Sequence, residues 1–110
     1  MKTERLSVRN DGPAPRRLIL EPWGMELSVP PGGSVGLELT GPQPGGAEVE
    51  HTPDGSICVY AWPGSTVVAR QAASIVYDTR AMPTPSPPGS LSMREFIRLV
   101  FGGPGKAGYR

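Results

Sequence analysis

The chain reads as an all-β domain, a small antiparallel β-sandwich or barrel with one short helix near its C-terminus. Apolar and polar residues alternate along short segments of the first 80 residues, the pattern of half-buried strands. Glycine and proline, 15 and 14 of the 110 residues, recur between these segments and mark turns. About eight short strands follow, and a jelly-roll-like order is one arrangement open to them. A chain of this length has room for one modest core.

We expect each alternating segment to form a strand, and the turn signal that follows the segment to mark the end of that strand. The segment around Leu6 and Val8 is closed by Asn-Asp-Gly-Pro, and the next one is closed by Pro22 and Gly24. We therefore interpret residues 1–80 as the sandwich domain. The same reasoning predicts strands at residues 6–8, 17–21, 25–29, 35–40, 47–52, 57–62, 66–70 and 74–79.

The clearest hairpin signal lies between residues 25–29 and 35–40. A five-residue loop rich in proline and glycine separates the two segments. If that loop closes symmetrically, Val29 faces Val35, and the apolar side chains of both strands gather on one face. The pattern therefore predicts that these two strands pair in one sheet.

A second hairpin is predicted around Pro53-Asp54-Gly55-Ser56. A symmetric register about this turn pairs His51 with Cys58 and puts Tyr60 on the same face as Trp62. The only histidine and the only cysteine would then be neighbours, and an imidazolium beside a thiol can activate it as a nucleophile. A structural role is favoured over an enzyme, because no third orienting group or further metal ligand is evident nearby and cysteine is commonly buried.

Aromatic residues suggest a ligand-binding alternative. Trp23, Tyr60 and Trp62 could line a site in which exposed rings stack on a sugar or another small ligand. Both tryptophans, however, lie where a strand meets a turn, and a tryptophan side chain buries a large area. The competing interpretation, which we favour, is that they close the ends of the core.

The C-terminal region carries the densest set of local signals. Residues 81–90 are expected to form a proline-rich linker, 91–101 an amphipathic helix and 102–110 a glycine-rich basic tail. Ser92 and Glu95 match the capping box at the start of a helix. The predicted partner-binding residues are Met93, Phe96, Ile97, Val100 and Phe101, with Arg94 and Arg98 at the rim.

Three fates are open to this helix. It could fold back over its own sandwich, dock on a partner protein or a second copy of the chain, or lie on a membrane surface. The stiff spacer favours docking at a distance, because eight residues of extended chain span on the order of 25 Å. An isolated helix of about ten residues is marginal in water, so we expect it to be ordered only where it is docked.

Charge is distributed unevenly along the chain. Residues 18–69 hold six of the ten acidic residues and none of the eleven lysines and arginines. This asymmetry could steer the basic tail onto the acidic body of the same or a neighbouring subunit. Ordinary solvated surface charge is the simpler interpretation.

The function that these patterns favour is a non-enzymatic protein-interaction or assembly module that acts on a protein partner or as a homo-oligomer. No motif predicts a cofactor or a metal, and the separated basic residues argue against nucleic-acid binding. No apolar run suits a membrane span or a signal-peptide core. A lone cysteine is typical of a reducing compartment, so we expect a cytoplasmic protein.

Overall fold

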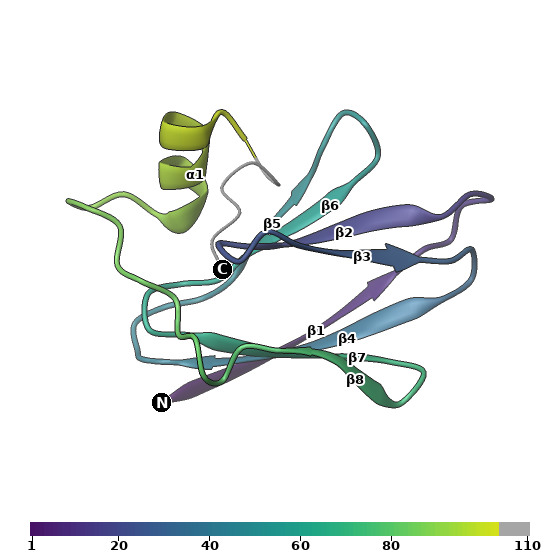
Figure 1. Cartoon of the computed structure of the whole chain (residues 1–110), viewed down its shortest axis with the longest axis horizontal. Helices are drawn as coiled ribbons and strands as arrows, with labels where there is room; N and C mark the ends of the chain where they lie inside the picture. Colours follow the sequence, from purple (N-terminus) through teal and green to yellow (C-terminus); the bar gives the residue numbers. More distant parts are fainter. Residues whose placement is uncertain (104–110) are drawn as a thin grey trace.

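The computed structural model describes residues 1–103 and shows two four-stranded sheets packed face to face, with one helix outside the second sheet (Figure 1). This confirms the β-sandwich with a short C-terminal helix. The strands are β1 (Lys2–Arg9), β2 (Arg16–Glu21), β3 (Met25–Val29), β4 (Ser34–Gly41), β5 (Glu48–His51), β6 (Ile57–Tyr60), β7 (Thr66–Gln71) and β8 (Ser74–Asp78), and the helix is α1 (Met93–Phe101).

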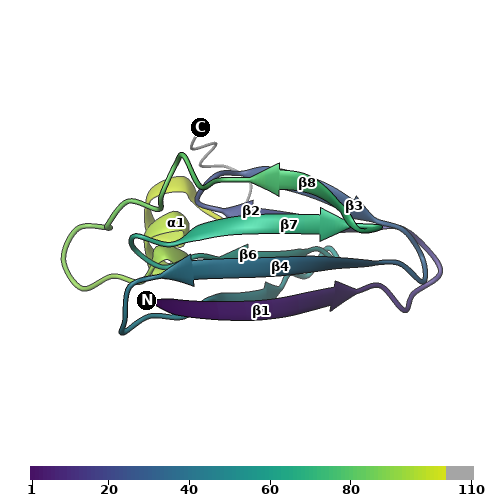
Figure 2. The same ribbon diagram turned by 90° about the horizontal axis from the view of Figure 1, so that it is seen from below.

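The sheet orders are β1-β4-β7-β8 and β3-β2-β6-β5. In the second sheet, the hairpins β2–β3 and β5–β6 lie side by side, and their inner strands β2 and β6 run parallel. The expectation of purely antiparallel pairing is therefore wrong at this one junction. Figure 2 shows β1 and β8 at opposite edges of the first sheet, so the strand order differs from that of a jelly roll.

The main core lies between the two sheets. Leu18 and Leu20 of β2 point inward from the second sheet, and Leu37 and Leu39 of β4 point inward from the first. All four are almost completely buried. Burial of this apolar surface is the principal driving force for folding of the sandwich.

The predicted hairpin between residues 25–29 and 35–40 does not form. β3 pairs only with β2, and β4 pairs with β1 and β7 in the other sheet. Asn10 fixes the position where the chain crosses from β3 to the other sheet. Its side-chain amide donates to the backbone carbonyl of Val29 at 2.9 Å, and its backbone carbonyl accepts from the backbone N–H of Gly32 at 2.7 Å. In a sandwich both inner faces share one core, so alternation shows that residues are buried together without showing that their strands pair.

The β7–β8 hairpin closes through an unusual turn. Gln71 pairs with Ser74, and the two residues between them, Ala72 and Ala73, have φ angles of 52° and 67°. Two-residue hairpin loops with positive φ normally use glycine or asparagine, because a Cβ atom is strained in this region. This turn therefore stores local backbone strain.

The proline-rich linker is not the free tether that the sequence suggested. Thr84 is buried, and its backbone N–H donates to the carbonyl of Ser65 at 2.9 Å while its carbonyl accepts from Gly64 at 2.8 Å. The indole N–H of Trp23 donates to the carbonyl of Met82 at 2.9 Å. The segment as far as Thr84 thus belongs to the sandwich, and only a short connection leads from there to α1.

Candidate interaction site on the C-terminal helix

Local signals define both ends of α1, as the sequence indicated. The Ser92 hydroxyl accepts from the backbone N–H of Glu95 at 3.1 Å, and the Glu95 carboxylate accepts from the backbone N–H of Ser92 at 2.9 Å. The second bond also holds the pKa of Glu95 below its usual value. Gly102 ends the helix with a φ of 84°. The predicted capping box is confirmed.

The first half of α1 packs on its own domain. Met93 and Ile97 are buried against Ile19, Cys58 and Tyr60, which project from the outer face of the second sheet. Of the three fates considered for the helix, folding back is the one observed. This corrects the expectation that Met93 and Ile97 contact a partner, because contacts within the chain already bury them.

Ion pairs reinforce this packing. Glu50 of β5 accepts a hydrogen bond from the Tyr60 hydroxyl at 2.7 Å and one from Arg94 at 3.0 Å, and it also pairs with Arg98. Arg94 lies 3.9 Å from Glu48 on the same strand. The two arginines therefore make ion pairs within the chain, and their place at the rim of a partner surface stays a prediction. Both arginines belong to α1; residues 104–110 of the predicted basic tail lie outside the described residues, so the attraction of that tail to the acidic body stays a prediction.

The turn between β5 and β6 has a different length from the one predicted. The backbone N–H of Thr52 donates to the carbonyl of Ser56 at 2.9 Å, which leaves three residues in the loop. Gly55 takes the left-handed conformation, with a φ of 88°, as the last residue of such a loop commonly does. A register drawn for a two-residue turn is therefore wrong by one residue.

That one-residue change separates the proposed nucleophile and base. His51 pairs with Ile57, and Cys58 pairs with Glu50, so His51 and Cys58 lie on opposite faces of the sheet. Cys58 is fully buried beneath α1, and this burial raises the pKa of its thiol to about 12. A buried, protonated thiol is a poor nucleophile, so the Cys58–His51 pairing is corrected and the structure offers no support for an enzyme built on it.

The three aromatic candidates do not form a ligand site. Trp23, Tyr60 and Trp62 are each at least 95% buried. Both tryptophans lie in the core between the sheets, whereas Tyr60 points to the opposite face, under α1. The expectation that Tyr60 and Trp62 share a face is wrong, because β6 ends at Tyr60 and the alternation of a strand does not extend to Trp62. The interpretation of the tryptophans as core residues is confirmed.

The last turn of α1 is exposed. Leu99, Val100 and Phe101 are 74%, 54% and 38% exposed. Val100 and Phe101 belong to the predicted partner-binding set, but Leu99 was missed because it lies outside the apolar stripe that begins at Met93. An apolar residue outside the buried stripe of a helix is itself a signal of an exposed apolar surface.

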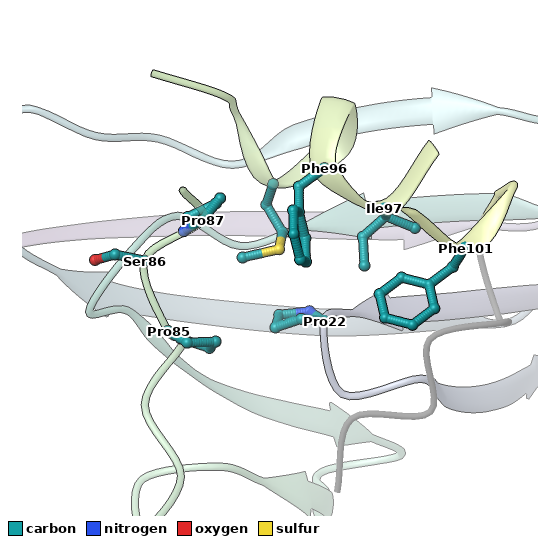
Figure 3. Close-up of a pocket in the computed structure, with 8 residues that line it drawn as sticks. Pro22, Pro85, Ser86, Pro87, Phe96, Ile97 and Phe101 are labelled. Atoms are coloured by element: carbon teal, nitrogen blue, oxygen red, sulfur yellow. The ribbon is translucent and has the colours of Figure 1, made fainter. Parts of the chain in front are cut away.

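An apolar pocket of about 210 Å³ adjoins this exposed turn (Figure 3). In the figure, Phe96 and Ile97 extend into it from α1, and Pro22 faces them from the end of β2. The proline-rich connection closes a third side. Among residues 1–103, the lining consists of Pro22, Pro85, Ser86, Pro87, Met93, Phe96, Ile97 and Phe101.

Comparisons with known proteins identify no relatives, since no protein-family model, curated protein or solved structure matches the chain. Within residues 1–103, no three histidine, cysteine or acidic side chains gather in a way that could hold a metal ion. The described part of the chain also contains no helix with the length and apolar character needed to cross a membrane. The exposed turn of α1 and its neighbouring pocket are therefore the candidate site.

Proposed function

We propose that the protein is a non-enzymatic protein-interaction module in which the exposed end of α1 docks on another protein chain. The observation that carries this proposal is the run Leu99-Val100-Phe101, three consecutive apolar side chains exposed at the end of an otherwise anchored helix. Contiguous exposed apolar surface on a small domain commonly marks an interaction site. The sandwich serves as the body that holds the helix.

The anchoring of α1 supports this role. Its buried side chains Met93 and Ile97 and its ion pairs to Glu50 hold the helix in one orientation before any partner arrives. A helix that is already ordered loses less conformational entropy on binding than a free tail does. The proposal therefore differs from a tethered arm, since the docking surface is a fixed part of the domain.

Two further parts of the proposal depend on the sequence. Another copy of the chain and an unrelated protein both remain as docking partners, and the experiment below separates them. We also place the module in the cytoplasm, because its single cysteine has no second cysteine with which to form an internal disulfide.

The test compares the full-length protein with the double variant Leu99→Gln/Val100→Gln. Glutamine keeps helix propensity while removing the apolar contact. Val49→Gln is the matched control, since Val49 is 45% exposed on β5 and lies outside α1. Sedimentation velocity over a range of concentrations measures self-association, and affinity capture with the purified chain, read by quantitative mass spectrometry, measures other partners.

We expect the double variant to lose association and the Val49 control to keep it. Concentration-dependent sedimentation would identify a second copy as the partner, whereas a monomer that captures one protein would identify a different chain. If association is absent, or survives the double substitution unchanged, the proposed function is wrong. Circular dichroism of each variant confirms that the fold is retained.

A further inference from the structure

The pocket beside α1 is built from three segments that lie far apart in the sequence. Pro22 follows β2, Pro85 and Pro87 belong to the connection before the helix, and Phe96 and Phe101 belong to α1 itself. This connection starts directly after Thr84, which is fixed to the sandwich, so the body of the domain positions the wall that Pro85 forms. The pocket is therefore preformed in the single chain.

The volume of the pocket limits what can fill it. An apolar cavity of about 150 Å³ in a protein core accommodates one benzene molecule. At about 210 Å³, the present pocket fits a six-membered ring and approaches the size of an indole. It is too small for a drug-sized ligand, which typically occupies roughly 300 Å³ or more.

The chemistry of the walls limits the occupant further. Among the described lining residues, Ser86 alone has a hydroxyl or amide group in its side chain, and none of them is charged. Burying a charge there would be costly, because none of the lining side chains within residues 1–103 could neutralise it. Phe96 and Phe101 already stand edge to face, with ring centroids 6.0 Å apart and an interplanar angle of 79°. A third ring can extend this arrangement, which aromatic pairs favour.

We propose that this pocket receives one uncharged aromatic side chain from the protein that docks on α1. The inference rests on the proposed function, because it takes the ring from the docked chain. Phe101 links the two surfaces, since it belongs both to the exposed turn and to the pocket wall. A protein that covers Leu99 and Val100 therefore reaches the pocket. Aromatic anchors in such pockets commonly supply much of the binding free energy.

The first experiment titrates the ¹⁵N-labelled full-length protein with three small probes of similar size. Benzyl alcohol is neutral and aromatic, cyclohexylmethanol is neutral and aliphatic, and benzoate is aromatic and anionic. We expect benzyl alcohol to shift the Phe96, Ile97 and Phe101 amide signals in a saturable way, with a dissociation constant on the order of millimolar. Binding of cyclohexylmethanol and benzoate should be several-fold weaker. Equal affinity for all three probes, or no saturable shift with benzyl alcohol, would overturn the inference.

Two matched variants locate the binding site. Phe101→Ala removes one wall of the pocket, and Leu99→Ala removes an exposed apolar side chain that does not line it. We expect Phe101→Ala to weaken benzyl alcohol binding about two- to tenfold, the range for loss of one aromatic contact, and Leu99→Ala to leave it unchanged. Equal effects of the two variants would contradict the assignment.

The last experiment tests whether the docked protein fills the pocket. Saturating benzyl alcohol should compete with association, as measured by sedimentation or capture, whereas cyclohexylmethanol at the same concentration should not. If association depends on Leu99 and Val100 but benzyl alcohol neither binds nor competes, the inference fails and the proposed function stands. If benzyl alcohol binds but association is insensitive to α1, the proposed function fails, and with it the assignment of the ring to a partner.

Discussion

The two faces of the β3-β2-β6-β5 sheet are buried in different ways. On the inner face, Leu18, Leu20 and Val59 meet the other sheet through a core of apolar side chains. On the outer face, Ile19 and Cys58 are covered by one short helix whose edge is held by ion pairs. The inner face is closed by a whole sheet, whereas the outer face is closed by nine residues.

This difference separates two kinds of opening. Exposing the inner face requires the sandwich to come apart, so its free energy is that of global unfolding. Exposing the outer face requires only that α1 leave the sheet, and an isolated nine-residue helix is unstable in water. We therefore expect α1 to open locally, at a lower free energy than the sandwich. Cys58, the single thiol of the chain, reports this event because it is fully buried under the helix.

The largest expected effect is on the inner face. Leu20→Ala should lower the free energy of unfolding by about 2–5 kcal/mol, because it leaves a cavity in a core that cannot easily collapse. Urea denaturation followed by tryptophan fluorescence measures this loss. The rate of Cys58 labelling by a thiol reagent in native buffer should change little, provided that α1 opens independently. A proportional rise in labelling would show instead that the helix and the sandwich open together.

The equivalent change on the outer face should have a different signature. Ile97→Ala removes a buried side chain from α1, and we expect about 2–3 kcal/mol less docking free energy. Cys58 labelling should accelerate roughly 30- to 150-fold, since 1.4 kcal/mol corresponds to a factor of ten. The urea midpoint should move much less than in Leu20→Ala. Similar urea effects for the two variants would contradict local opening.

The ion pairs at the edge of α1 should contribute less. Glu50→Gln removes the carboxylate that Arg94 and Arg98 share and leaves Arg94 only its long pair with Glu48, so we expect it to weaken docking by about 1–2 kcal/mol. Glu48→Gln on the same strand is the matched control, because the Glu48–Arg94 pair is long and half-exposed and should contribute almost nothing. The rate of Cys58 labelling measures the loss of docking free energy in both variants. Equal labelling rates would show that the ion pairs do not hold the helix.

The same two faces explain what the sequence could predict. Strand positions and helix caps were recovered because alternation, turn residues and the capping box are local signals. The sheet partners of residues 25–29 and 35–40 were predicted wrongly, because alternation does not distinguish strands that share a sheet from strands that share a core. The face of His51 was wrong because the loop also includes Pro53, and one extra loop residue inverts the register.

One signal for the position of α1 was present in the sequence. Leu18-Ile19-Leu20 and the segment 57–60 are continuous apolar runs without alternation, and such runs are typical of strands buried on both faces. They indicate that another element must cover the outer face, and α1 does so. The pocket had no comparable signal, because its walls come from segments that only the tertiary structure brings together.

A substitution in the first sheet should change global stability without changing Cys58 labelling, the reverse of the pattern expected for Ile97→Ala. Ala73→Gly should relieve the strain of the left-handed turn and raise global stability by about 0.5–1 kcal/mol, because glycine adopts positive φ without a Cβ clash. Cys58 labelling should not change, since this hairpin lies in the sheet that α1 does not touch. A lower urea midpoint would show that the added backbone entropy of glycine outweighs the strain.

The smallest expected effect is a pH dependence confined to α1. The backbone N–H of Ser92 lowers the pKa of Glu95, so Glu95 stabilises the helix fully above its unfolded pKa of about 4.3. This contribution is lost as the pH falls through the lower, folded pKa. Glu95→Gln keeps an acceptor for the capping box but cannot titrate. Hydrogen exchange of the α1 amides should therefore rise more steeply below pH 4.3 in the wild type than in Glu95→Gln. The two proteins differ in no other ionisable group, so the difference between the two profiles isolates Glu95. Parallel profiles would show that the cap does not stabilise the docked helix.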